Sequence, residues 1–131
     1  MAGELILVVE DNEKNRKLVR DVLQFHGYRI AEAETAEEGL RLARETPPAL
    51  VLMDIQLPGM SGIEALGHLR ADPATRAIPV IAVTASAMTH DRQKILASGF
   101  DGYQSKPINV KEFVAAVRQT LDRAHGTGGA S

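Results

Sequence analysis

The sequence predicts an α/β protein in which a five-stranded parallel sheet carries five helices, distributed over both of its faces. Short apolar runs of strand length alternate along the chain with stretches in which apolar residues recur at helical spacing. This alternation favours parallel strands joined by right-handed crossover helices. With 131 residues, 44% of them hydrophobic, the chain can form one full core and has no room for a second. We therefore expect one domain over residues 1–124 and a disordered tail at 125–131.

The clearest predicted strands are apolar runs without polar alternation, a pattern typical of strands that are buried on both faces. The clearest runs are Leu5 to Val9, Leu50 to Met53 and Ile78 to Val83, and weaker ones are Tyr28 to Ala33 and Phe100 to Gln104.

Helix starts and stops lie between these runs. The first helical pattern runs from Leu18 to Phe25 and ends before Gly27, a suitable C-terminal cap. Thr35 and Ser61 are each followed three residues later by a glutamate, which is the spacing of a capping box and predicts two helix starts.

Two more helices follow in the second half of the chain. A weak pattern between Ala87 and Ala97 predicts the fourth helix, with Gly99 as its cap. Asn109 is a good N-cap for the fifth, which carries an apolar face. Five strands and five helices therefore alternate from end to end.

Composition excludes several classes of function. The 15 Lys and Arg against 17 Asp and Glu give a net charge of −2 without a basic cluster, which argues against direct nucleic-acid binding. The absence of cysteine excludes a disulfide scaffold and a thiolate metal site. The first apolar run is too short, and too soon followed by acids, for a signal peptide or a membrane span, so we expect a cytoplasmic protein.

Polar residues of particular types follow four of the predicted strands. Glu10 and Asp11 follow the first, Asp54 the third, Thr84 the fourth and Lys106 the fifth. In open parallel sheets, ligands bind beyond the carboxyl ends of the strands, where the winding direction changes. An ionised Asp54 at the end of a buried strand is costly unless a partner or a metal neutralises it. We therefore expect these side chains to form one site.

Phosphoryl chemistry is the reaction that this set of residues favours. Three carboxylates in one crevice repel each other by roughly 4 kcal/mol per pair at about 4 Å and an effective dielectric constant of ~20, so they need a cation. Oxygen ligands with room for water favour Mg²⁺ completed by a phosphate oxygen. Asp54 is the expected nucleophile, with Lys106 and Thr84 stabilising the phosphoryl group. The product is an acyl phosphate, which is labile and suits a reversible signal.

The same residues resemble a known family. Glu10-Asp11, Asp54, Thr84-Ala85 and Lys106-Pro107 are similar in order and spacing to the motif set of the response-regulator receiver domain of two-component signalling. The resemblance covers about residues 4–124. It implies a flavodoxin-like, doubly wound sheet with strand order 2-1-3-4-5. It also implies that Asp54 takes its phosphoryl group from a phosphohistidine on a histidine kinase or phosphotransferase.

The resemblance further implies a role for each matched residue. The metal ligands would be Glu10, Asp11, Asp54 and the backbone carbonyl of Gln56. The residues that stabilise the phosphoryl group would be Thr84, Ala85 and Lys106, and the switch pair would be Thr84 and Tyr103. A cis Lys106–Pro107 bond is implied as well.

Partner contacts are implied on two surfaces. A kinase or phosphotransferase is expected to dock near Asn15 and Val19 and on the loop at Pro107 and Ile108. Phosphorylation is expected to alter the surface of the fourth helix, fifth strand and fifth helix, which would contact a downstream protein. Gln56 and Ser86 are expected to influence the lifetime of the phosphate. A stand-alone receiver that shuttles phosphate or regulates kinases is preferred over one that binds a motor.

Three alternatives compete with this interpretation. A phosphohydrolase of the haloacid dehalogenase type resembles an Asp-x-Asp pattern, but Gln56 stands two residues beyond Asp54, so we do not expect an enzyme. A docking scaffold that never takes phosphate would not need the intact set of acceptor residues. The chain could also be a receiver fragment of a longer regulator.

Overall fold

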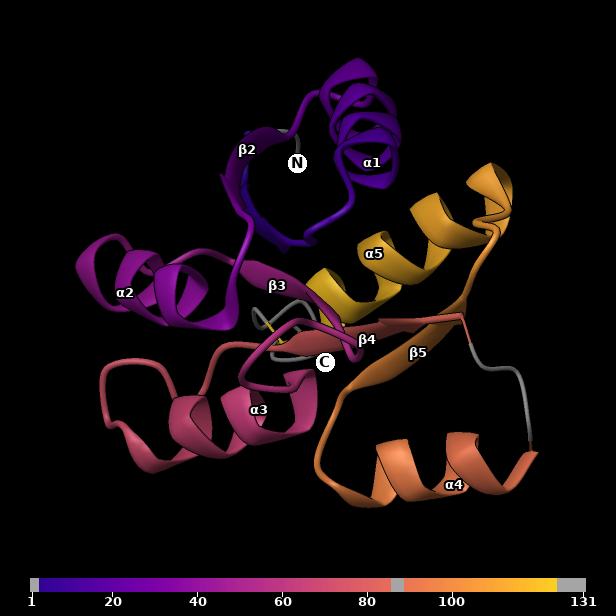
Figure 1. The fold of residues 1–131 in the computed structure, drawn as a ribbon. Helices are drawn as coiled ribbons and strands as arrows, with labels where there is room; N and C mark the ends of the chain where they lie inside the picture. Colours follow the sequence, from indigo (N-terminus) through magenta and orange to yellow (C-terminus); the bar gives the residue numbers. More distant parts are fainter. Residues whose placement is uncertain (1–2, 86–88, 125–131) are drawn as a thin grey trace.

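The computed structural model describes residues 3–85 and 89–124, in which strands and helices alternate as predicted (Figure 1). The strands are β1 (Leu5–Val9), β2 (Arg29–Ala33), β3 (Leu50–Asp54), β4 (Val80–Thr84) and β5 (Gly102–Ser105). The helices are α1 (Glu13–Phe25), α2 (Ala36–Glu45), α3 (Gly62–Ala71), α4 (Thr89–Ala97) and α5 (Val110–Ala124). The expected tail at 125–131 and the expected helix start at Ala87 lie outside the described residues.

All neighbouring strands pair in parallel, in the order β2-β1-β3-β4-β5, which confirms the implied topology. The chain moves outward from β1 to β2 and then returns past β1 to β3. The winding direction therefore changes between β1 and β3, and in such sheets the ligand crevice lies at this switch point, beyond the carboxyl ends of the two strands. This is where the residues after β1 meet the last residue of β3.

Two separate core clusters cover the faces of the sheet. Alternate residues of β1 serve opposite faces: Ile6 and Val8 pack with side chains of α1 and α5, whereas Leu7 and Val9 pack with those of α2, α3 and α4. Figure 1 shows the same division, with α1 and α5 on one side of the sheet and the other helices across it. Because both faces are covered, the central strands β1, β3 and β4 are almost entirely apolar and show no alternation, whereas the edge strands β2 and β5 carry polar residues.

Two predicted strand boundaries are wrong by two residues. β4 begins at Val80 and not at Ile78, whose backbone N–H donates instead to the carbonyl of Thr75 in the preceding turn. Pro79 has no N–H to give to a ladder. β5 begins at Gly102 and not at Phe100, although the Phe100 side chain is buried in the core.

The predicted helix caps are confirmed, with one change of partner. Ser61 and Glu64 form a complete capping box at the start of α3. Thr35 accepts a hydrogen bond from the Glu38 N–H, but the Glu38 carboxylate bonds to the N–H of Glu34 and not to that of Thr35. The box predicted at Thr35 is therefore only half formed.

α1 begins earlier than its apolar pattern predicts. Its first residue is Glu13, and the side chain of Asn12 caps it by accepting a hydrogen bond from the Asn15 N–H. The first turn of α1 carries polar residues, so hydrophobic periodicity cannot reveal it. In the described part of the chain, none of the helices combines the length and apolar character needed to span a membrane.

Candidate functional site

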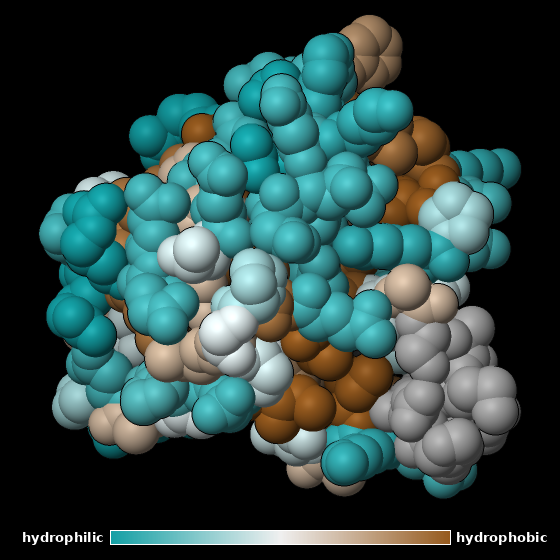
Figure 2. Space-filling view, viewed as in Figure 1, coloured by the Kyte–Doolittle hydropathy of each residue, from teal (hydrophilic) through white to brown (hydrophobic). Residues whose placement is uncertain are grey.

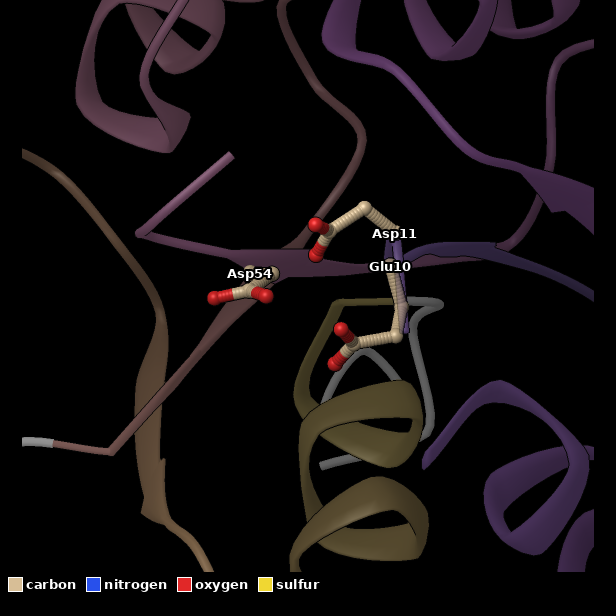
Figure 3. Close-up of side chains that lie close together, drawn as sticks. All are labelled: Glu10, Asp11 and Asp54. Carbon is tan, nitrogen blue, oxygen red and sulfur yellow. The ribbon is translucent and has the colours of Figure 1, made fainter. Parts of the chain in front are cut away.

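Three carboxylates gather at the switch point between β1 and β3 (Figure 3). Glu10 directly follows β1 and Asp54 ends β3, and both are buried, with exposed fractions of 5% and 3%. Asp11 is exposed at the mouth of the crevice. One carboxylate oxygen from each residue lies within 4.8 Å of the others. The predicted convergence of these acids is thus seen in the fold.

Lys106 enters the same crevice from the loop after β5. Its Nζ lies 2.8 Å from Oε1 of Glu10 and 3.2 Å from Oδ2 of Asp54. Its backbone N–H donates to the carbonyl of Thr84 at 2.8 Å, which fixes the start of the loop against β4. The lysine therefore bridges two buried carboxylates that belong to different strands.

Burial and ion pairing act in opposite directions on these groups. For Glu10, burial outweighs the hydrogen bonds from Lys106 and Asn12, so the pKa of its carboxyl is raised above its usual value. For Lys106, burial would lower the pKa, but the bond to Glu10 and the charge of Asp54 outweigh it and raise the pKa of the ammonium. The bond from Lys106 thus does not fully offset the burial of Glu10, whereas the two carboxylates favour the charged form of the lysine.

The backbone after β3 holds the Asp54 side chain. The Gln56 N–H donates to Oδ1 of Asp54 at 3.0 Å, so each carboxylate oxygen has a partner, one from this loop and one from Lys106. The Gln56 side chain is exposed. Its backbone carbonyl stays a predicted metal ligand, and Ser86 lies outside the described residues.

Gly62 is a site residue that the sequence interpretation missed. A Cβ at this position would overlap the carbonyl oxygen of Asp54 and would lie 2.9 Å from Cα of Ile55. The Gly62 N–H donates to the carbonyl of Ile55, the residue after β3, so α3 begins in direct contact with the end of that strand. A glycine after a capping serine carries no sequence signal of this contact. Gly59, which has a φ of +76°, provides the left-handed turn before it.

Thr84 and Tyr103 lie on the same face of the sheet. Thr84 ends β4 and is 1% exposed. Tyr103 of β5 pairs in register with Ala82, two residues before Thr84, so their side chains point to the same side. Tyr103 is half-buried and packs against the core on the side of α2, α3 and α4. Ala85 follows β4 and is exposed.

One predicted docking residue needs correction. Val19 is 5% exposed and packs in the core between α1 and the sheet, so its side chain cannot offer a contact surface. Leu18, beside it in the sequence, is 42% exposed and takes its place in the docking proposal. Asn15 and Ile108 are half-buried, and Pro107 is exposed after a cis peptide bond, as the resemblance implies.

The fold and its acidic switch point define a receiver domain. The model of the family described as the response regulator receiver domain matches residues 6–118, and the chain belongs to this family. It is accordingly a response regulator receiver of two-component signalling.

Individual relatives agree with this assignment. The chain is 46% identical over 119 residues to the polar-differentiation response regulator DivK of Brucella ovis. This match covers 91% of this chain and 97% of the relative. Among solved structures, it resembles the receiver domain of a sensor histidine kinase from Pseudomonas aeruginosa, described with magnesium coordinated in the active site cleft. That structure has a TM-score of 0.84 and 32% identity, and the match covers 92% of this chain and 98% of that one. A CheY-like receiver from Methanospirillum hungatei has a TM-score of 0.86 and 29% identity, with 96% and 99% covered.

Proposed function

We propose that Asp54 is the phosphoacceptor of this receiver. The observation that carries the proposal is the setting of its carboxylate: buried at the switch point, held at Oδ1 by the Gln56 N–H and at Oδ2 by Lys106, and beside two further acids. A carboxylate held in one orientation next to a cation is suited to attack an incoming phosphorus atom.

A divalent cation fits the charge and chemistry of the crevice. Among the described residues, Lys106 pairs with two of the three carboxylates, which leaves an excess of negative charge, and the three acids offer oxygen ligands. Hard oxygen ligands and partial access to water favour Mg²⁺. Glu10, Asp11 and Asp54 would hold it, together with the Gln56 carbonyl. When bound, it would neutralise charge on the phosphoryl oxygens.

The proposed transfer uses these residues as follows. An Asp54 oxygen attacks phosphorus of a phosphohistidine while the nitrogen–phosphorus bond breaks. The bonding electron pair stays on the imidazole nitrogen of the donor protein, which then takes up a proton. Lys106 pairs with the phosphoryl group, and the Thr84 hydroxyl donates a hydrogen bond to one of its oxygens, with Ala85 contributing beside it. The chain acts as an acceptor and not as an enzyme for a small substrate.

A phosphorylation assay tests the acceptor. The purified chain is incubated with acetyl phosphate and Mg²⁺, and a mobility shift is followed on a phosphate-retarding gel. We expect a shift that is lost in Asp54→Asn and after chelation with EDTA. Asp21→Asn is the matched control, because this exposed carboxylate pairs with Lys17 on α1 and lies outside the crevice. A folded chain that takes phosphate from neither acetyl phosphate nor a phosphohistidine protein would favour the docking-scaffold alternative.

Output is proposed to pass through Thr84 and Tyr103 to α4, β5 and α5. Because both side chains lie on one face of the sheet, a Thr84 hydroxyl drawn toward the phosphoryl group would make space for the Tyr103 ring. Leu96 of α4 and Val110 of α5 are 38% and 44% exposed and would contribute to a contact surface. Figure 2 shows a mostly hydrophilic face with an apolar area between α3 and α4. We propose that the downstream partner is a protein. We further propose that the chain acts in the cytoplasm, as a phosphorelay shuttle or as an effector of a kinase.

The donor is proposed to be a histidine kinase or phosphotransferase that docks on α1 and the loop after β5. Asn15→Ala and Ile108→Ala should slow transfer from a phosphorylated histidine phosphotransferase but not from acetyl phosphate, which needs no docking surface. Equal transfer rates from the protein donor to the native chain and both variants would refute this docking site.

A further inference from the structure

Arg16, on the first turn of α1, is bound to the backbone of the acidic site. Its Nη1 donates to the carbonyl oxygen of Glu10 at 2.9 Å, and its Nε donates to Oε1 of Glu32 in β2 at 3.1 Å. The side chain is only 14% exposed, so these bonds are shielded from water. The guanidinium thus ties a helix, an edge strand and the end of β1 together.

The carbonyl that Arg16 holds belongs to the peptide unit joining Glu10 to Asp11. The Glu10 N–H is fixed by the Ala33 carbonyl at 3.0 Å, and the Glu10 carboxylate is fixed by the Asn12 N–H and by Lys106. In contrast, Asp11 is exposed, and its carboxylate can occupy a defined place only if the peptide before it is oriented. Arg16 supplies a side-chain bond that sets this orientation.

We infer that Arg16 is a positioning residue for the cation site: by holding the Glu10 carbonyl, it aims the Asp11 carboxylate at the position shared with Glu10 and Asp54. This inference depends on the proposed binding of Mg²⁺ and deepens it. Residues that do not bind the metal but hold its ligands in place by hydrogen bonds contribute about 10- to 100-fold to metal affinity. Arg16 is expected to contribute at the lower end, because it acts on one of three carboxylates through a peptide bond.

Charge alone predicts the opposite effect. Arg16 carries a positive charge near the crevice, and removing it would strengthen the binding of a cation if no orientation were lost. A weaker affinity after removal therefore identifies positioning.

Arg20 provides a matched control. It lies one turn further along α1 and donates from Nη1 to both oxygens of Glu32, at 3.1 and 3.0 Å. It has the same charge, helix and ion-pair partner as Arg16, but it donates to Glu32 and not to the Glu10 carbonyl. Arg16→Met and Arg20→Met thus both remove an ion pair to Glu32, and only the first releases the peptide of Asp11.

The test measures Mg²⁺ affinity by titration calorimetry for the native chain and both variants, together with urea unfolding in EDTA. We expect Arg16→Met to bind Mg²⁺ about tenfold more weakly. Arg20→Met should stay within about twofold of native, since it changes only charge and an ion pair at the edge of the site. Native or tighter binding by Arg16→Met, or equal weakening in both variants, would overturn the inference.

A second readout needs no metal. The amide N–H of Asp11 is in the peptide unit whose carbonyl Arg16 holds, so its NMR chemical shift in EDTA should move in Arg16→Met and stay near native in Arg20→Met. If Arg16→Met does not fold, Arg16→Lys keeps the charge but loses the planar fork that reaches both acceptors. Native Mg²⁺ affinity and an unmoved Asp11 amide in that variant would overturn the inference. A native chain that binds no Mg²⁺ would instead refute the proposed cofactor.

Discussion

Lys106 is the cation that the chain itself contributes to the acidic crevice. It pairs with Glu10 and Asp54, which are both buried, so these carboxylates depend on it while no metal is bound. Removing one partner of such a cluster leaves charge without compensation in a poorly hydrated place.

We expect Lys106→Met to lower the free energy of unfolding of the metal-free chain by about 1–3 kcal/mol, the range for a buried polar group that loses its partner. Urea unfolding in EDTA measures this loss. Lys111→Met is the control, because Lys111 is exposed on α5, and its removal should change stability by about 0.5 kcal/mol at most. A Lys106→Met chain with an unchanged urea midpoint would show that water already screens the crevice.

Gly62 lies too close to the backbone after β3 to carry a side chain. In Gly62→Ala the new methyl group meets the backbone of Asp54 and Ile55, which cannot move aside as a flexible side chain would. We expect a loss of about 1–3 kcal/mol in stability, the usual penalty for overpacking, and slower phosphorylation by acetyl phosphate.

Gly67 in the same helix is a suitable control for Gly62. A Cβ there meets nothing within 4 Å, so Gly67→Ala should gain up to about 1 kcal/mol from the better helix propensity of alanine. If thermal unfolding showed the two alanine variants to be equally stable, the contact with Asp54 would not restrict the start of α3.

At the scale of elements, the caps decide where helices begin. The Ser61 side chain accepts from the Glu64 N–H, and the Glu64 side chain accepts from the Ser61 N–H. α3 therefore starts directly after the loop that follows Asp54. The hydrophobic core alone would not specify this first turn, because Gly62 has no side chain to bury.

Loss of the Ser61 cap should therefore destabilise the protein. We expect Ser61→Ala to lower the free energy of unfolding by about 1 kcal/mol. Ser61→Asp, which can still accept the hydrogen bond from the Glu64 N–H, should recover most of it. Urea unfolding of both variants checks this expectation, and equal losses would mean that the cap is replaced by water.

An ion pair between Glu4 and Arg118 joins the segment just before β1 to α5. Arg118 Nη2 lies 2.9 Å from Oε2 of Glu4, and its Nη1 donates to the Tyr28 hydroxyl at 3.3 Å. Burial would raise the pKa of Glu4, but the bonds and charge from Arg118 outweigh it and lower the pKa below the ordinary 4.5. The ion pair therefore contributes stability above pH 4.5, and this contribution is lost as the pH falls through the lower pKa of the folded state.

Glu4→Gln should accordingly be less stable than the native chain by about 0.5–1 kcal/mol at pH 7. The difference should shrink as the pH falls below 4.5 and Glu4 becomes protonated in the native chain. Urea unfolding from pH 7 to pH 3 measures it, with Glu45→Gln as a control in an exposed ion pair with Arg41. A difference that stays constant with pH would assign the effect to packing.

The fold was predictable because each local signal agreed with it. Buried strands such as β3 show as uninterrupted apolar runs, and caps such as Ser61 show as residue pairs at fixed spacing. The strand order came from family resemblance, since alternation alone does not specify it. Boundaries were less accurate where a buried side chain, such as that of Phe100, lies in a turn outside its strand.

The convergence of Glu10, Asp11, Asp54 and Lys106 was also predictable, because charged side chains stand out at the ends of apolar runs. Their supporting contacts were not. Gly62 acts through the absence of a side chain, and Arg16 through a backbone carbonyl, so neither has a sequence pattern. Val19 was taken as a docking residue from the family resemblance, which gives a position on α1 but not which neighbouring side chain is exposed; Val19 is buried, and Leu18 beside it is exposed. The family resemblance was confirmed by the family model over residues 6–118 and by the 46% identity to a DivK protein.

The sheet also separates two potential binding partners. α1 packs on one face and α4 on the other, and the two core clusters beneath them have no side chain in common. A donor on α1 and a target on α4 would therefore sit on opposite faces of the sheet, but their proposed surfaces adjoin at Ile108 and Val110, at the start of α5. If both partners dock as proposed, they would meet only there, and a target confined to α4 could bind while the donor is still in place.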